Sequence, residues 1–207
     1  MKQAEFMDVI KSRRSIRKFK PDAVPKADIE QMIEAATWAP SGSNQQNWHF
    51  IVIESGDLKH KMSDAMLNKV NVMAEKITSA TAKKEFLSYS KYFGFFADAP
   101  AVIAVIKKPY NSLSMRIMDR YGFSNEHKST ADIQGPAAAI QNLLLCAQNL
   151  GYGTCWMTGP MVARKELEAV IGISDPDELM ALIPVGVPEG AAQAPKRKPV
   201  SEITEYK

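Results

Sequence analysis

The chain has 207 residues, of which 45% are hydrophobic and 24% are charged, as in an ordinary globular protein. Its 26 basic residues are interleaved with 23 acidic ones, and a net charge of +3 is too small to indicate a nucleic-acid partner. No apolar run reaches the roughly 20 residues that a membrane span requires. We therefore expect a single domain over residues 1–207, with neither a membrane nor a nucleic-acid partner.

The first predicted element is a short amphipathic helix over residues 4–11. This segment carries acidic residues and has no long apolar core, which argues against a signal peptide. The two cysteines, Cys146 and Cys155, form neither a Cys-x-x-Cys motif nor a disulfide framework. Such cysteine usage is typical of a reducing compartment, so we expect a cytoplasmic location.

Hydrophobic periodicity predicts the remaining elements in chain order. The first half contains a helix over 26–38, a strand over 49–53, a mostly helical stretch over 57–96 and a strand over 101–106. The second half contains a helix over 133–150, a strand over 153–157, a helix over 164–171, a strand over 181–187 and an extended tail after Gly190. Residues 110–130 are polar and weakly periodic, and we interpret them as a surface excursion that could serve as a lid. A few short strands among long helices favour an α+β fold with one sheet covered by helices.

The most informative motif is Arg13-Arg14-Ser15-Ile16-Arg17, which places three guanidinium groups and a hydroxyl within five residues. Arginine presents a planar fork of donors that matches phosphate oxygens, and it stays charged at any working pH. Since clustered arginines repel one another, the motif predicts a bound anion; the alternative is a solvated basic turn. Two further clusters strengthen the first interpretation, a polar segment over 40–48 and a basic segment over 196–199.

Several other classes of site have no support in the sequence. No Gly-x-Gly-x-x-Gly follows a predicted strand, and no phosphate loop of the nucleotide-hydrolase type is present. His49, His60 and His127 are dispersed and lack metal-ligand spacing, so we predict no metal site.

Together, the segments 13–17, 40–48, 151–160 and 194–199 resemble the FMN-dependent nitroreductase family, in the same order and over nearly the whole chain. The resemblance implies an α+β, nitroreductase-like fold, in which a mixed central sheet is wrapped by helices and two subunits intertwine. It also implies a homodimer with shared FMN sites, NADH or NADPH as electron donor, and a small-molecule acceptor. No side chain is then needed as a catalytic nucleophile or base, because the flavin carries the redox chemistry.

Carried over residue by residue, the resemblance implies the following cofactor-binding set: Arg13, Arg14, Ser15, Arg17, Pro40, Ser41, Gly42, Asn44, Met157, Thr158, Gly159, Lys196 and Arg197. Within it, Arg13 and Ser15 would hold phosphate or ribityl oxygens, and Arg17 would lie near the pyrimidine edge of the flavin. A positive charge at that edge is useful because reduced flavin carries negative charge there.

The other matched segments have distinct implied roles. The loop over 40–44 would reach the flavin of the other subunit, and a backbone amide near Thr158 or Gly159 would donate to flavin N5. Arg197 matches the carboxy-terminal phosphate ligand of the family, and the choice among Lys196, Arg197 and Lys198 stays open. For both internal segments the alternative is a plain polar loop or turn.

The chain also departs from the family pattern. Asn47 stands where the family usually has proline, Pro195 replaces a second basic residue, and Thr158 stands where some members have a glutamate. This last difference bears on specificity for nitroaromatic substrates. Tyr110, Tyr121 and Phe123 are candidates to line a substrate cavity, or else packing anchors.

The function we expect is that of an FMN-dependent NAD(P)H oxidoreductase, which passes hydride through flavin N5 to a nitroaromatic, a quinone or another small organic acceptor. Two alternatives remain: a flavin enzyme of the same fold with a different reaction (dehydrogenation, reductive dehalogenation or flavin fragmentation), and a non-enzymatic FMN-binding module.

Overall fold

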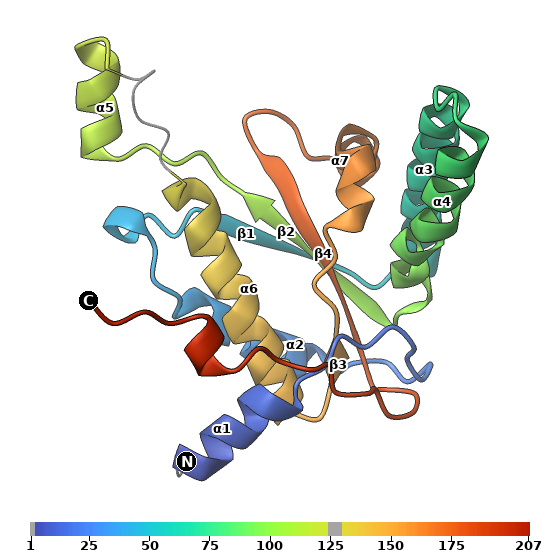
Figure 1. Cartoon of the computed structure of the whole chain (residues 1–207), viewed down its shortest axis with the longest axis horizontal. Helices are drawn as coiled ribbons and strands as arrows, with labels where there is room; N and C mark the ends of the chain where they lie inside the picture. Colours follow the sequence, from blue (N-terminus) through green and yellow to red (C-terminus); the bar gives the residue numbers. More distant parts are fainter. Residues whose placement is uncertain (1–2, 124–129) are drawn as a thin grey trace.

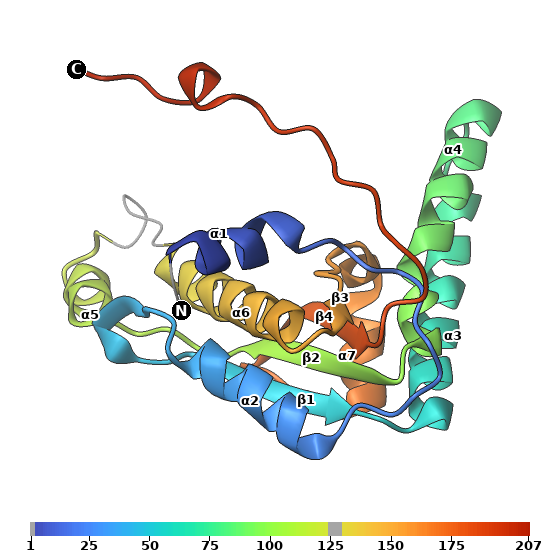
Figure 2. The ribbon, with the colours of Figure 1, turned by 90° about the horizontal axis from the view of Figure 1, so that it is seen from below.

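The computed structural model describes residues 3–123 and 130–207 and has an α+β fold (Figures 1 and 2). Its helices are α1 (Gln3–Ser12), α2 (Lys26–Thr37), α3 (Gly56–Glu75), α4 (Ala80–Ser90), α5 (Leu113–Arg120), α6 (Ala131–Asn149) and α7 (Arg164–Ile171). Its strands are β1 (Trp48–Ile53), β2 (Ala101–Lys107), β3 (Gly153–Thr154) and β4 (Glu178–Gly186). Within the described part of the chain, no helix is both long and apolar enough to cross a bilayer.

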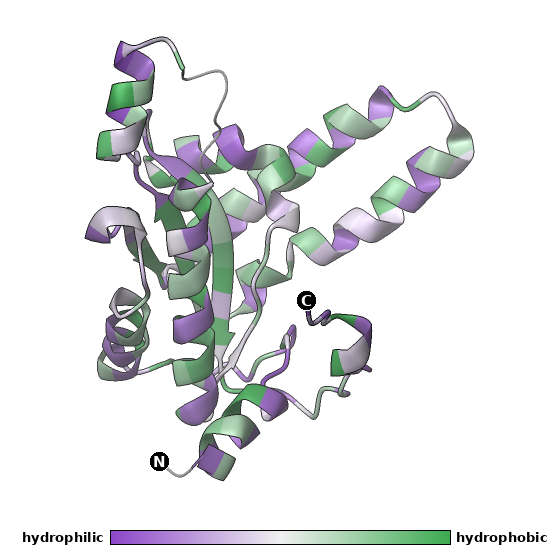
Figure 3. Cartoon of the chain, turned by 60° about the vertical axis from the view of Figure 1, so that its left-hand side comes forward, coloured by the Kyte–Doolittle hydropathy of each residue, from purple (hydrophilic) through white to green (hydrophobic). Residues whose placement is uncertain are grey.

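The sheet has the strand order β1-β2-β4-β3, and every neighbouring pair is antiparallel. Helices α2 and α6 cover one face, and α3 and α7 cover the other. Successive residues of β2 point to opposite faces, with Ile103 and Val105 toward α6, and Val102 and Ile106 toward α3. Because both faces are covered, β2 is an unbroken apolar run as far as Lys107, and the strands at the centre of Figure 3 are largely green.

The expected mixed sheet is present only in a minor form. Ser15 forms an isolated parallel bridge with Thr154, in which the Ile16 amide donates to the Thr154 carbonyl at 2.9 Å. The four strands themselves pair antiparallel. The parallel contribution therefore comes from the arginine turn lying alongside β3.

Strand β3 is shorter than the expected 153–157, and a proline in its neighbour supplies the reason. Leu182 and Met157 exchange two backbone hydrogen bonds, at 3.0 and 3.1 Å. In an antiparallel pair, every second residue of a strand points its backbone N–H and C=O groups toward the same neighbour, so after Leu182 the next such residue of β4 is residue 184. Residue 184 is a proline, which has no amide hydrogen to donate to the chain segment after β3. The backbone at Cys155 and Trp156 is therefore released from the sheet and passes by the candidate site.

The stretch over 57–96 is mostly helical, as expected, and the structure adds detail to it and to the excursion over 110–130. The stretch over 57–96 is divided into α3 and α4, with Ser79 capping α4 by accepting from the Ala82 amide at 3.3 Å. The polar excursion over 110–130 contains α5, which Ser112 caps in the same way. Leu113 and Ile117 of α5 and the Tyr121 that follows it recur every four positions, a helical spacing that the surrounding polar residues obscured. Residues 124–129 of the expected lid lie outside the described residues.

Candidate functional site

Backbone contacts fix the arginine turn in place between β3 and the chain after β4. Besides the Ile16 contact, the Lys20 amide donates to Val187 at 2.9 Å, and the Glu189 amide donates to Lys18 at 3.0 Å. Gly153 makes the close approach possible, because a Cβ there would lie 2.6 Å from Cγ1 of Ile16. The turn is thus held by the fold rather than left in solution.

Beside this turn lies a cavity of about 310 Å³, which we call the arginine pocket. It is lined by Arg13, Arg14, Ser15, Arg17, Ala192, Gln193, Pro195 and Arg197. Four guanidinium groups from opposite ends of the chain therefore meet at one place. Among the described residues, none of the four forms an ion pair with a carboxylate. A concave cluster of positive charge without an acidic partner is suited to bind a phosphate group.

The four arginines differ in how much of their hydrogen-bonding capacity the protein itself uses. Arg14 donates through Nη1 to the carbonyls of Lys11 and Arg13, and Arg17 donates to the carbonyl of Ser15 at 3.2 Å. No side-chain hydrogen bond ties Arg13 or Arg197 to another described residue. These two guanidinium groups therefore have most of their donors available for a ligand.

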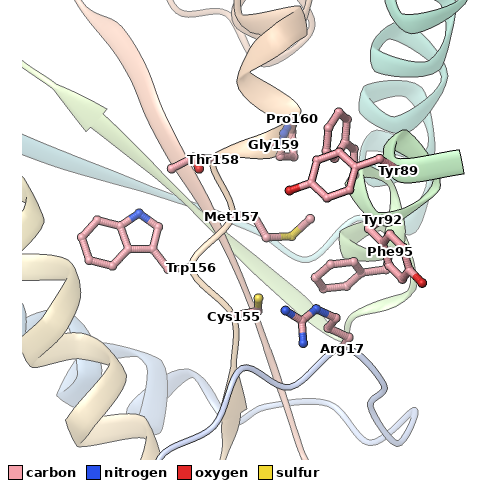
Figure 4. A pocket seen from close by; sticks show the side chains of 11 residues that line it. Arg17, Tyr89, Tyr92, Phe95, Cys155, Trp156, Met157, Thr158, Gly159 and Pro160 are labelled. Atoms are coloured by element: carbon pink, nitrogen blue, oxygen red, sulfur yellow. The ribbon is translucent and has the colours of Figure 1, made fainter. Parts of the chain in front are cut away.

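A second cavity, of about 400 Å³, adjoins the first, and we call it the ring cavity. Arg17 lines both cavities and so marks their junction. Met157, Thr158 and Gly159 line the ring cavity, on the chain segment that follows β3 (Figure 4). The Met157 side chain points toward Tyr89, whereas the Trp156 side chain points in the opposite direction.

Sequence reasoning missed the opposite wall of the ring cavity. Tyr89, Tyr92, Phe93 and Phe95 line it from the end of α4 and the two 3-10 turns that follow, Lys91–Phe93 and Phe95–Asp98. A signal was present, because five aromatic residues fall within positions 89–96. In contrast, Tyr110, Tyr121 and Phe123 do not line this cavity.

The thiol of Cys155 lies where the two cavities meet. Burial raises the pKa of this thiol, and Arg17, the Ser15 hydroxyl and Arg13 oppose that shift. The side chain is 5% exposed, and Figure 4 places its sulfur beside the Arg17 guanidinium. The positive field of the arginine turn therefore extends into the ring cavity.

The loop over 40–44 stands apart from both cavities. Pro40, Ser41 and Gly42 line a different cavity of about 330 Å³, together with the first turns of α6, and Asn44 lines none of the three. Within one chain, the loop is therefore not brought together with the arginine turn.

The shape of this loop is nevertheless well determined. The Ser41 hydroxyl accepts from the Gln46 amide at 2.9 Å, and Gln45 exchanges two hydrogen bonds with the backbone of Asn111. Asn47, 3% exposed, donates to the Asp132 carbonyl at 2.9 Å and so anchors the end of the loop to α6. Asn47 thus anchors the loop to the start of α6.

The three basic residues of the tail lie differently with respect to the arginine pocket. Arg197 lines the arginine pocket, whereas Lys196 and Lys198 do not. The spacing of three consecutive basic residues could not make this choice, because it depends on the path of the extended chain after β4. Gln193, which was not expected, supplies a neutral polar side chain to the same pocket.

Comparisons with known proteins agree with this geometry. The profile of the nitroreductase family matches residues 10–187. The chain is 28% identical over 195 residues to YfhC of Bacillus subtilis, which is provisionally named an NAD(P)H nitroreductase, covering 94% of this chain and 90% of that protein. It is 30% identical over 213 residues to an iodotyrosine deiodinase of Nematostella vectensis, covering 98% and 75%.

A solved structure extends the match to three dimensions. The crystal structure of a BluB-like flavoprotein from Clostridium difficile 630 superposes with a TM-score of 0.88 at 36% identity, covering 97% of this chain and 98% of that one. Because the family profile spans residues 10–187, most of the sequence, the chain belongs to the nitroreductase family.

Proposed function

We propose that this protein binds FMN, with the phosphate in the arginine pocket and the flavin ring in the adjoining ring cavity. The observation that carries the proposal is the convergence of four arginines, none of them ion-paired within residues 3–123 and 130–207, at a cavity that adjoins an aromatic one at Arg17. FMN combines a dianionic end with a flat ring, and the two cavities match these two ends in charge and in polarity.

The residues present fit this cofactor in chemical detail. Arg13 and Arg197 have donors that the protein does not use, and Ser15 and Gln193 add neutral polar groups for the sugar-like chain between phosphate and ring. The other wall is apolar and aromatic, and a planar ring can pack against it.

When bound, FMN would supply the redox chemistry, by accepting a hydride from NADH or NADPH at N5 and passing it to a small organic acceptor. Arg17 would place its positive charge at the pyrimidine edge, where it favours the reduced state. The backbone at Thr158 begins a 3-10 turn (Gly159–Ala163), whose first amides have no partner inside the turn. One of these amides would donate to N5 and orient the ring.

We further propose that the protein acts as a homodimer in which the loop over 40–44 contacts the FMN of the partner. Two observations support this: the loop has a fixed shape but stands away from its own arginine pocket, and apolar side chains are exposed on α1 and after α2. Trp38 is 81% exposed, and Phe6 on α1 is 49% exposed. A second subunit that covers these side chains would bring the loop to a shared site.

A second candidate keeps the flavin but changes the reaction. The high similarity to a BluB-like flavoprotein and the match to deiodinases over 98% of the chain favour it, as does threonine at position 158 in place of a glutamate. The two candidates share FMN binding and differ in the donor and in the substrate that is reduced or cleaved.

One sequence of measurements tests both candidates. The purified protein, mixed with FMN and gel-filtered, should retain a yellow colour with flavin absorbance; a colourless protein would refute the proposal. Anaerobic mixing with excess NADH or NADPH should then bleach the flavin. Bound FMN that nicotinamide does not bleach favours the second candidate, and slow turnover with every acceptor favours an FMN-binding module without enzymatic activity.

A further inference from the structure

We propose that Lys107 is a positioning residue for the cofactor site, which holds the loop over 40–44 and the turn Gly159–Ala163 in a fixed relation to each other. This inference rests on the proposed function, because these are two of the segments that would contact FMN in the homodimer. Lys107 lines neither the arginine pocket nor the ring cavity, so it would act through other residues. The inference is carried by a continuous series of hydrogen bonds and ion pairs that runs from the loop to the turn.

The series begins where a proline in α6 leaves a backbone carbonyl without its usual partner. In a regular helix, the carbonyl of Asp132 would accept from the amide of residue 136, but Pro136 has no amide hydrogen. The Asn47 side chain takes this place and donates to the Asp132 carbonyl at 2.9 Å. The loop over 40–44 is therefore attached to the first turn of α6 through an acceptor that the helix itself leaves open.

The side chain of Asp132 continues the series to the end of β2. The Nζ of Lys107, the last residue of that strand, donates to the Asp132 carboxylate at 3.0 Å. The same Nζ lies 3.1 Å from a carboxylate oxygen of Glu178, the first residue of β4. Burial alone would lower the pKa of Lys107, but hydrogen bonds and charges from these two carboxylates outweigh burial and raise it above 10.5. Lys107 therefore stays charged and bridges two carboxylates that would otherwise repel each other.

The second oxygen of Glu178 leads to the turn that borders the ring cavity. It lies 3.0 Å from Nη1 of Arg164, which begins α7 directly after the turn Gly159–Ala163. The turn is only five residues long, so the position of Arg164 helps to set the direction of the backbone amides at its start. These amides are the proposed donors to the flavin ring.

The series also crosses from one face of the sheet to the other. Helix α6 packs on one face and α7 on the opposite face, and Lys107 lies between them at the end of β2 (Figure 2). Apolar packing is non-directional, whereas charge-assisted hydrogen bonds have a defined donor–acceptor geometry. The ion pairs of Lys107 can therefore fix the two helices relative to each other in a way that their apolar contacts do not.

Three variants test this inference. Lys107→Met keeps most of the length of the side chain but removes its charge, which leaves Asp132 and Glu178 to repel each other. Lys107→Arg keeps the charge and offers several donors that can serve both carboxylates. Lys108→Met is the matched control, because the neighbouring Lys108 also loses an ion pair, with Asp177, but that pair lies outside the series.

Each variant is titrated with FMN under conditions where urea denaturation shows the apoprotein to be folded, and the visible spectrum and midpoint potential of the bound FMN are recorded. We expect Lys107→Met to raise the Kd for FMN about 2- to 30-fold, a range typical of residues that act on a site through others, and to shift the spectrum and the potential. Lys107→Arg should return all three quantities toward the parent values, and Lys108→Met should leave them unchanged.

The outcomes separate the inference from the proposed function. If the parent binds FMN and Lys107→Met loses stability alone, with the Kd, spectrum and potential of the parent, Lys107 has only a structural role and the inference is overturned. Equal changes in Lys108→Met would also overturn it, because they would indicate a general effect of charge. If Lys107→Met does not fold, Asp132→Asn tests the same link, since it keeps the carbonyl that Asn47 uses; it should shift the same three quantities, and parent values would overturn the inference. A parent protein that holds no FMN would refute the proposed function itself.

Discussion

The adjacent residues Arg13 and Arg14 should behave very differently when each is replaced by alanine. Arg13 has no side-chain hydrogen bond to another described residue, whereas Arg14 already donates to the carbonyls of Lys11 and Arg13. If Arg13 makes one charged hydrogen bond to the FMN phosphate, its loss costs about 1.5 to 3 kcal/mol, or about a 10- to 150-fold increase in the Kd for FMN. Arg14→Ala removes the same charge from the same pocket. Its main effect, however, is to remove hydrogen bonds that Arg14 makes within the protein.

The two variants therefore give opposite patterns. Arg13→Ala should weaken FMN binding at least five times more than Arg14→Ala, while the apoprotein keeps its stability because one of four mutually repelling charges is gone. Arg14→Ala should instead lower the stability of the apoprotein by about 1 kcal/mol. Fluorescence titration with FMN measures the Kd, and urea denaturation measures the stability of the apoprotein. Equal Kd values for the two variants would refute the assignment of Arg13 to the phosphate.

Three further predictions concern packing, pH and assembly. Gly153→Ala should place a methyl group against Ile16, destabilise the protein by about 1 to 3 kcal/mol and weaken FMN binding. Gly56→Ala, where the added methyl group meets open space, should change neither stability nor FMN binding. Equal melting temperatures for the two variants would contradict this prediction. Burial lowers the pKa of the Lys59 ammonium in the folded protein below its usual 10.5. Between the folded-state pKa and 10.5, the unfolded chain therefore binds more protons at Lys59 than the folded protein does, and this group makes the free energy of unfolding rise with pH. Urea denaturation of Lys59→Met across this pH range should show a free energy of unfolding that rises less steeply with pH. An unchanged slope would count against Lys59 as the source of the pH dependence. Finally, dilution to the monomer should release FMN if the loop over 40–44 serves the partner, and flavin retained by a verified monomer would disprove sharing.

The candidate site was predictable to different degrees. The arginine turn could be identified because three guanidinium groups in five residues have few structural uses, and the structure places them in one cavity with Arg197. The preference for Arg197 over its lysine neighbours could not be predicted, because all three residues carry the same charge. Whether the loop over 40–44 reaches a partner's flavin stays a prediction, since that contact would form between subunits.

The amino-acid sequence alone determined the family, the α+β class, and most helices and strands, and it predicted an anion-binding turn. Each of these depends on residues close together in the chain or on ordered motifs, and such signals survive without coordinates. Only the tertiary structure decided where β3 ends, because that depends on a missing amide at Pro184 in a strand nearly 30 residues later. It also decided that Tyr89 and Tyr92 line the same cavity as Thr158, because segments far apart along the chain lie close together in space.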